Sequence, residues 1–429
     1  MKIIRTDSAE FEEHFRKIRE RGRVFDPELW AAVGRIVEEV GQRGDEALFD
    51  YTARWDGHAV TAATVEAKAS ERKVAAAQVL PEDAEILRLA AGRIERFHEH
   101  QRCEGWSIAD EEGVELGQRI LPLARVGIYA PGGLACYPST VLMTAIPARI
   151  AGVGEIILVT PSRDGRLHPL IAAAAEIGGV NRIFKIGGAQ AIAALAFGTA
   201  SVPRVDKIVG PGNAYVAAAK KMVFGRVAID MIAGPSEVLI IADGTGEAAY
   251  AAADLLAQAE HDEMASAVLL TPDEAYAGAV AGEVGRQLAD LPRREIASRA
   301  LDAFGAAVVT RDLAEAVALA NRFAPEHLEL MVRNPRELLA EIRNAGAIFL
   351  GMHTPEALGD YVAGPNHVLP TGGTARFASP LGVYDFIKRT SVLSFSREAI
   401  ERYGSQSARF AELEGFGGHG NSVRLRLKK

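Results

Sequence analysis

Two side chains that can bind a metal ion lie three residues apart in the segment 255–262. Gln258 and His261 occur in a run whose composition predicts a helix, and this spacing places both on one helical face. An imidazole nitrogen is a common ligand of zinc and an amide oxygen is an unusual one, so further ligands must come from elsewhere. Taken alone, the pair fits half of a metal site or an ordinary polar face of a helix.

An acid and an imidazole stand next to each other in the segment 325–330. Glu326 and His327 follow a predicted helix end and lead into a strand. Neighbours within a strand point to opposite faces, whereas both can face a cleft in the turn before it. There they would offer two proton-transfer groups with ordinary pKa values of about 4.3 and about 6.5. The other interpretation is an exposed glutamate beside a partly buried histidine.

Two glycine-containing segments carry further polar side chains. Asp360 and His367 lie in a loop of low apolar content, and Glu414 precedes His419 across a glycine-rich turn. Loops of this kind often carry function. One glutamine, one aspartate and two histidines would make a ligand set rich in nitrogen and oxygen, suited to zinc or a similar divalent metal. Spacing does not decide whether these side chains meet.

The elements that would position these residues alternate in type from Arg125 onwards. Short β-rich runs alternate with alanine-rich helical stretches, which is the pattern of a parallel sheet covered by helices. The predicted strands are 125–129, 155–160, 182–186, 206–209, 237–242, 266–270, 306–310 and 346–350. Their number predicts an α/β fold with two doubly wound lobes and a break near residues 234–236.

The two ends of the chain differ from this middle part. The N-terminal region reads as mainly helical, and the C-terminal region predicts a helix near 397–413 and a last strand from Ser422 to Leu427. The short tail could pack on another subunit. The expected division is a helical region over 1–124, two lobes over 125–235 and 236–380, and a tail over 381–429.

Composition narrows the class of protein. A chain of 429 residues exceeds the usual size of one hydrophobic core, so two or more domains are expected. Cys103 and Cys136 form no C-x-x-C pattern, cannot supply a thiolate metal cage, and are typical of a reducing compartment. A net charge of −8 without a long basic cluster argues against nucleic acid as a partner. No apolar run is long enough to span a bilayer, so we expect a cytoplasmic protein without a membrane partner.

The glycine loops after the predicted strands are the places where open α/β sheets bind ligands. Residues 210–212, Gly-Pro-Gly, follow a strand and open a helix, but the third glycine of the G-x-G-x-x-G pattern is missing. The chain also has no G-x-x-x-x-G-K-[ST] loop, which excludes a P-loop for nucleoside triphosphates. A dinucleotide would have to bind in a non-standard way.

Several long motifs occur in a fixed order along the chain. They are residues 125–133, 187–195, 210–215, 234–237, 257–262, 324–329, Gly359-Asp360 with 366–370, and Glu414-Gly with His419. On these motifs the chain resembles the histidinol dehydrogenase family over almost its whole length. The resemblance implies a homodimer of subunits with two incomplete Rossmann-like lobes, in which the tail completes the partner's active site.

The resemblance also implies site residues. The zinc ligands would be Gln258, His261, Asp360 and His419, the last supplied by the other subunit. The NAD contacts would be Tyr129, Gln190 and Asn213 on the first lobe. The substrate contacts would be Ser236, Gln258, His261, His327, Asp360, His367, Glu414 and His419.

The implied activity is the oxidation of L-histidinol to L-histidine, the last steps of histidine biosynthesis. Two successive hydride transfers to NAD would pass through bound L-histidinaldehyde. His327 would be the general base, and Glu326 would activate the water that adds to the aldehyde. Zinc would hold the imidazole and amine of the substrate, while Glu414 and His367 would favour its cationic end.

Three other functions remain open on the residues alone. A related zinc-dependent dehydrogenase would oxidise another small alcohol, such as a sulfonated diol, although the Glu414 carboxylate would repel a sulfonate. A zinc hydrolase would use Glu326 as its base, but the chain has no H-E-x-x-H motif. A non-catalytic nucleotide-binding module would leave the adjacent acid and imidazole without a role.

Overall fold

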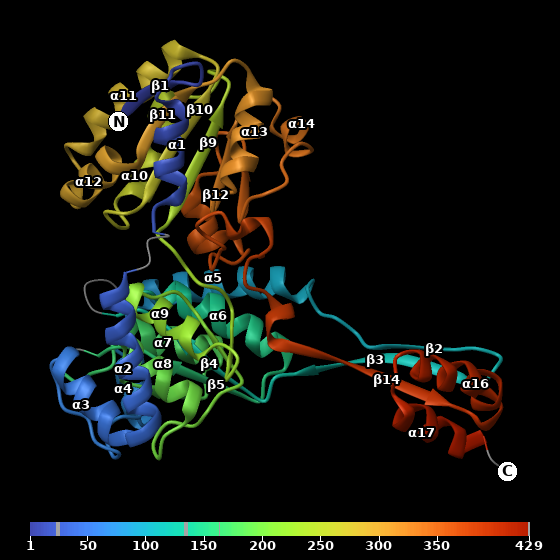
Figure 1. The fold of residues 1–429 in the computed structure, drawn as a ribbon. Coiled ribbons are helices and arrows are strands. Elements are labelled where there is room, and N and C mark those ends of the chain that lie inside the picture. The colour runs from blue at the N-terminus through green and yellow to red at the C-terminus, as the bar shows by residue number, and fades with distance from the viewer. Residues whose placement is uncertain (23–25, 133–135, 163, 428–429) are drawn as a thin grey trace. The chain divides into compact units, whose positions relative to one another are not determined.

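The computed structural model describes residues 1–22, 26–132, 136–162 and 164–427. The chain forms two compact units, shown in Figure 1, and each unit combines segments that are far apart in the sequence. Unit 1 comprises 1–101 and 124–386, and unit 2 comprises 102–123 and 387–429. The four-part division along the sequence stays a prediction.

The first parallel sheet lies in unit 1 and has the order β6-β5-β4-β7-β8. Its strands are β4 (Arg125–Tyr129), β5 (Glu155–Val159), β6 (Arg182–Phe184), β7 (Lys207–Val209) and β8 (Ala228–Ile229). Its helices are α2 (Pro27–Arg43), α3 (Asp45–Trp55), α4 (Ala69–Ala76), α5 (Pro81–Glu99), α6 (Pro138–Ala151), α7 (Pro169–Gly178), α8 (Gly188–Phe197) and α9 (Ala214–Val223). The strand order reverses between β4 and β7, so a ligand crevice is expected beyond their carboxyl ends.

Alanine-rich helices allow close packing in this lobe. Helix α8 is buried from Ala189 to Ala196, and it packs against α2, which buries Val33, Ile36, Val37 and Val40. Small side chains let α8 lie near the sheet, and Gly127 of β4 leaves room for Leu195. The helix is therefore held by apolar contacts on several sides, and its first turn is fixed beside the strand ends.

The second parallel sheet, also in unit 1, has the order β1-β11-β10-β9-β12-β13. Its strands are β1 (Lys2–Arg5), β9 (Glu237–Ala242), β10 (Ser266–Thr271), β11 (Gly305–Val309), β12 (His327–Met331) and β13 (Ala347–Leu350). Its helices are α1 (Phe11–Glu20), α10 (Ala248–Ala259), α11 (Glu274–Leu288), α12 (Arg294–Phe304), α13 (Leu313–Phe323) and α14 (Pro335–Leu339). All eight strands predicted between residues 125 and 350 form, and the prediction of an α/β fold with parallel sheets is confirmed.

Unit 2 is an antiparallel sheet with two helices. The sheet has the order β14-β3-β2, with β2 (Trp106–Ala109), β3 (Val114–Pro122) and β14 (Ile387–Phe395). The helix predicted near 397–413 is confirmed as α16 (Arg397–Leu413). No described helix is both long and apolar enough to cross a membrane.

The predicted last strand from Ser422 to Leu427 is wrong, because these residues belong to helix α17 (Gly417–Leu427). The segment alternates polar and apolar residues, which is typical of a strand. Val423 and Leu427 are also four residues apart, and in a helix they share one face. Both pack on Gly404 of α16, where the missing side chain lets the two helices approach closely.

Candidate functional site

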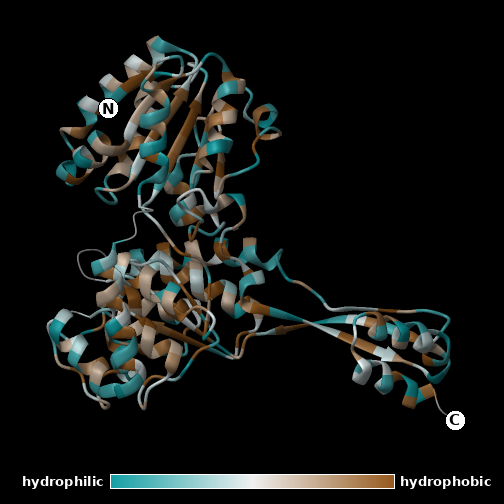
Figure 2. Cartoon of the chain, viewed as in Figure 1, coloured by the Kyte–Doolittle hydropathy of each residue, from teal (hydrophilic) through white to brown (hydrophobic). Residues whose placement is uncertain are grey.

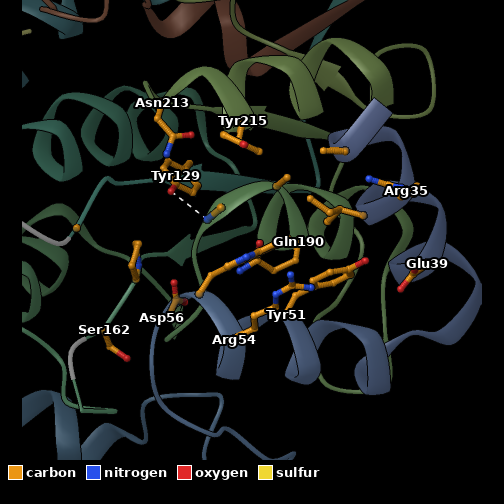
Figure 3. A pocket seen from close by; sticks show the side chains of 17 residues that line it. Arg35, Glu39, Tyr51, Arg54, Asp56, Tyr129, Ser162, Gln190, Asn213 and Tyr215 are labelled. Carbon is orange, nitrogen blue, oxygen red and sulfur yellow. Dashed lines mark hydrogen bonds between the residues drawn. The ribbon is translucent and has the colours of Figure 1, made fainter. Parts of the chain in front are cut away.

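A cavity of about 950 Å³ opens beside the first sheet, and Figure 3 shows the side chains that line it. Tyr129 at the end of β4, Gln190 in the first turn of α8 and Asn213 before α9 all face it. The structure thus brings together the three residues that the sequence assigned to NAD. Gly133, the last residue of the first motif, lies outside the described residues.

The loops around this cavity are fixed by buried polar contacts. Asp230 accepts a hydrogen bond from Gly210 N at 2.7 Å and forms a buried ion pair with Lys220, whose Nζ donates to Gly210 O at 2.9 Å. Gly210 has a φ of 109°, and its backbone lies directly against that of Tyr129. A side chain at position 210 would therefore collide with the end of β4, which explains this glycine.

The three residues assigned to NAD, which we call the neutral pocket, carry uncharged side chains, whereas Arg35, Glu39, Arg54 and Asp56 also line the cavity. Gln190 is buried, yet neither its amide nitrogen nor its amide oxygen has a hydrogen-bond partner. Burial raises the pKa of Tyr129 to about 12, so its phenol stays protonated, and its Oη accepts from Gly188 N at 3.1 Å. Asn213 Oδ1 accepts from Val216 N at 3.1 Å and caps α9. An unpaired buried amide is costly, so a ligand with matching donors and acceptors, as a dinucleotide has, fits this cavity.

A second group of polar residues lies at the amino ends of β9 and β12 in the other lobe. His327 opens β12 and is buried, with Nδ1 3.1 Å from the backbone oxygen of Glu237. Its Nε2 has no hydrogen-bond partner and lies 3.6 Å from Asp360 Oδ1. Burial alone would lower the pKa of His327, but the carboxylates around it raise that pKa well above its usual value.

Glu326 is held immediately beside this imidazole. Its Oε2 accepts from Glu237 N at 2.9 Å and lies 3.8 Å from His327 Nδ1. Burial raises the pKa of Glu326 to about 7, while the neighbouring His327 lowers it. The pair therefore consists of a buried acid and a buried imidazole that both titrate away from their ordinary ranges, which is typical of proton-transfer sites.

Three residues next to this pair form a candidate metal centre. His261, Glu356 and Asp360 each offer a ligand atom, and these atoms lie within 4.8 Å of one another. His261 lies two residues beyond the end of α10, and burial lowers its pKa, which favours the neutral imidazole that binds metals. Asp360 lies in one turn of π-helix, η1 (Gly359–Ala363). One imidazole and two carboxylates are a donor set that suits zinc or a similar divalent cation.

Gln258 lies in the last turn of α10 and reaches the same centre. The hydrogen-bond network places its amide nitrogen toward Glu356, donating to Oε1 at 2.9 Å and Oε2 at 3.0 Å. Its amide oxygen then lies on the opposite side of the planar group and remains available to a cation.

The sequence interpretation missed Glu356, which begins the short helix α15 (Glu356–Leu358). Burial raises its pKa to about 8, and its backbone nitrogen donates to the buried carboxylate of Glu329 at 3.0 Å. The sequence signal that could have revealed Glu356 is its spacing of four residues from Asp360, because this spacing along a helical segment places two acids on one face.

The remaining predicted substrate contacts fall into two groups. His367 Nδ1 lies 2.9 Å from the backbone oxygen of Asp360, and Nε2 lies 3.4 Å from Thr140 Oγ1, so His367 joins the centre. Ser236 directly precedes β9. Glu414, at the end of α16, and His419, in α17, belong to unit 2, and their assignment to this centre stays a prediction.

The described residues thus form a two-lobed α/β protein, with a cavity of about 950 Å³ beside one parallel sheet and a centre of histidines and carboxylates beside the other. The family model described as histidinol dehydrogenase matches residues 19–427. A histidinol dehydrogenase of Syntrophotalea carbinolica is 56% identical over 428 residues, which cover 100% of this chain and 99% of that protein. One from Aquifex aeolicus is 50% identical over 423 residues, which cover 99% of this chain and 98% of the relative.

Structural comparison gives the same result. The crystal structure of histidinol dehydrogenase from Elizabethkingia anophelis superposes with a TM-score of 0.93 at 38% sequence identity, covering 100% of this chain and 98% of that one. The chain belongs to the histidinol dehydrogenase family, as its ordered motifs predict.

Proposed function

We propose that this chain oxidises L-histidinol to L-histidine through bound L-histidinaldehyde, the last steps of histidine biosynthesis. The observation that carries the proposal is the buried Glu326 and His327 pair beside the centre of His261, Glu356 and Asp360. NAD supplies the hydride acceptor for both oxidations, and zinc supplies a charged anchor for the imidazole and amine of the substrate.

His327 is the general base of the proposal. The backbone oxygen of Glu237 can only accept a hydrogen bond, so the 3.1 Å contact places a hydrogen on Nδ1. The Gln258 amide nitrogen also lies 3.2 Å from Nδ1, but its two hydrogens have closer acceptors in Glu356 Oε1 and Oε2, at 2.9 and 3.0 Å. The carboxylates of Glu356 and Asp360 favour the imidazolium, and a cation held by them would offset this effect and favour neutral His327. In that form the lone pair lies on Nε2, the unpartnered nitrogen, which takes the proton of the substrate hydroxyl.

Glu326 serves the second oxidation. Its raised pKa of about 7 gives the carboxylate enough basicity to take a proton from the water that adds to the aldehyde. His327 then removes the proton of the hydrated aldehyde as the second hydride leaves. Glu326 and His327 lie 3.8 Å apart, so both can act in turn on one substrate that stays bound.

The remaining assignments extend this proposal to cofactors and substrate. Tyr129, Gln190 and Asn213 bind NAD. Zinc is held by Gln258, His261 and Asp360, with His419 of the partner subunit. The substrate contacts are Ser236, Gln258, His261, His327, Asp360, His367, Glu414 and His419, and the enzyme acts in the cytoplasm.

A homodimer is supported by the surface of unit 2. Strand β2 is exposed along its whole length, including Trp106 and Ile108, and α16 exposes Phe410 and Leu413 at 64% and 69%. Figure 2 shows apolar residues along these elements. Exposed apolar side chains gathered on one small unit mark an interaction surface. We assign that surface to a second copy of the chain, whose tail then brings Glu414 and His419 to the centre.

The test is NADH absorbance after L-histidinol and NAD are added to the zinc-loaded protein. The proposal expects two NADH formed for each histidinol consumed, and histidine as the product. A sulfonated diol serves as the competing substrate. Turnover of the diol in preference to histidinol, or no NADH with zinc present, would overturn the proposal.

A further inference from the structure

A buried arginine connects the N-terminal segment to the residues that hold the acid–imidazole pair. The Arg21 side chain, directly after α1, is 1% exposed and forms an ion pair with the equally buried carboxylate of Glu237 at 3.1 Å. Its other described acceptors are the backbone oxygens of Ile18 (3.0 Å), Ser236 (3.0 Å), Pro235 (3.3 Å) and Met264 (2.7 Å). One guanidinium therefore fixes the backbone just before β9 and just before β10.

The chain next to Arg21 is fitted closely to the same segment. Gly22 has a φ of 71°, and a Cβ built on it would lie 2.6 Å from Cδ of Pro235. Both the conformation and the close approach require glycine. The end of α1 is thus seated directly on the start of β9, and Arg21 enters the interior at that point.

Glu237 connects this arginine to the acid–imidazole pair by three hydrogen bonds. Its Oε2 accepts from the backbone nitrogen of Glu326 at 3.2 Å, and its own nitrogen donates to Glu326 Oε2 at 2.9 Å. Its backbone oxygen accepts from His327 Nδ1 at 3.1 Å. Its Oε1 accepts from the Arg21 guanidinium at 3.1 Å and from the backbone nitrogen of Gly372 at 3.2 Å. The orientation of Glu326 and the tautomer of His327 therefore both depend on where Glu237 lies.

Anchoring of α1 does not require a buried ion pair. Phe11, Phe15 and Ile18 of α1 are buried in the apolar cluster of the second sheet, and Phe15 packs on Phe323. Apolar residues of similar volume often stabilise a fold as well as a buried ion pair does, because charges lose hydration on burial. A buried pair at the end of an already anchored helix points to a role in geometry.

We propose that Arg21 and Glu237 are positioning residues for both oxidations: the pair fixes the Glu326 carboxylate and keeps the hydrogen of His327 on Nδ1. The inference rests on the proposed roles of Glu326 and His327. Arg21 and Glu237 do not touch the substrate. They act through the backbone of β9 and the turn before β12.

The experiment compares Arg21→Met, Glu237→Gln and the double variant in the full-length, zinc-loaded protein. Methionine keeps much of the volume of arginine without its charge, and glutamine keeps the shape of glutamate. We expect kcat for histidinol and for histidinaldehyde to fall by about 10–100-fold in each single variant, as for other residues that orient catalytic groups. The KM for NAD and the zinc content should stay unchanged. Because the two residues act as one unit, kcat of the double variant should be no lower than kcat of the less active single variant.

Phe15→Ala is the control for a purely structural role. It weakens the packing of α1 and should lower the unfolding midpoint, with kcat per folded enzyme within about twofold of the wild type. If Arg21→Met does not fold, the kcat of Glu237→Gln alone tests the positioning role. A kcat within about twofold of the wild type in a folded variant, or an equal loss of kcat in Phe15→Ala, would overturn the inference.

His327→Asn separates this inference from the proposed function. Near-normal turnover in His327→Asn would refute the assignment of His327 as the general base, and with it the proposed function of the pair. An inactive His327→Asn together with Arg21→Met and Glu237→Gln variants that behave like Phe15→Ala would refute only the positioning role.

Discussion

The two parallel sheets of unit 1 share one architecture but carry different chemistry at their edges. The first places glycine loops and neutral side chains at the carboxyl ends of β4 and β7. The second places imidazoles and carboxylates at the amino ends of β9 and β12. Close approach of loop backbones at the first sheet requires glycine, as at Gly210 against Tyr129, whereas a proton-transfer site needs buried charges whose partners come from distant segments.

The comparison predicts different kinetic consequences for the two sites. Loss of a side chain at the neutral pocket should weaken binding, because the cofactor is held equally before and during the reaction. Loss of a side chain at the charged centre should slow the chemical step.

The largest effect is expected for His327→Asn. Asparagine removes the proton acceptor and leaves the candidate metal ligands in place, so kcat should fall by about 10²–10⁴-fold. Steady-state NADH formation and metal analysis of the purified variant measure the two quantities. The exposed His100→Asn serves as the control. If the variant lost zinc as well as activity, His327 would have to be assigned as a metal ligand and not as the general base.

Glu326→Gln should affect the two oxidations unequally. Glutamine cannot take a proton from water, so oxidation of histidinaldehyde should slow by about 10²-fold or more and oxidation of histidinol by less. Single-turnover measurements that start from each substrate give both rates. Equal slowing of the two steps would contradict the water-activating role.

The pH dependence of stability should also distinguish the two sites. The raised pKa of Glu326, about 7, means that the folded protein keeps a proton that the unfolded chain releases near pH 4.5. The unfolded chain binds fewer protons in this window, so the free energy of unfolding should fall as pH rises from about 4.5 to about 7, on the order of 1–3 kcal/mol.

Denaturant unfolding of the zinc-free protein measures this slope. Glu326→Gln should reduce the slope without abolishing it, because Glu356, whose pKa burial raises to about 8, contributes in the same direction. Gln190→Leu in the neutral pocket should leave the slope unchanged, and a slope that Glu326→Gln does not reduce would contradict the raised pKa of Glu326.

The smallest effect is expected for Gln190→Leu. It replaces a buried amide that lacks partners, so the free protein should become slightly more stable. The KM for NAD should rise by about 2–10-fold with little change in kcat, since one neutral hydrogen bond contributes about 0.5–1.5 kcal/mol. Thermal unfolding and NAD titration test the two parts. A large fall in kcat would show that the first lobe also takes part in the chemical step.

The same contrast explains what the sequence could predict. The strands of both sheets are runs rich in valine and isoleucine between glycines, so periodicity and turn residues locate them. The three residues of the neutral pocket lie at or shortly after the carboxyl ends of β4, β6 and β7, which places them together once the sheet is parallel. The charged centre is different, because Glu356 and Arg21 are ordinary charged residues in sequence, and only their tertiary partners make them buried.

Long-range partners also explain one strand that was not predicted and one wrong assignment. Strand β1 is short and charged at both ends, and its pairing with β11 is invisible in the local sequence. The segment 422–427 has a pattern compatible with strand or helix, and packing on Gly404 of α16 decides for the helix. Local pattern fails where a contact from another segment selects between two allowed structures.

The position of β1 at the edge of the second sheet has a consequence for biosynthesis. Residues 2–5 pair with residues 306–309, so during translation β1 and α1 emerge roughly 300 residues before their partner strand. The first sheet, between them in sequence, can form while Phe11 and Phe15 still lack their core. We expect ribosome-bound chains that end after residue 235 to protect the first lobe from protease and to leave the segment around α1 open to cleavage.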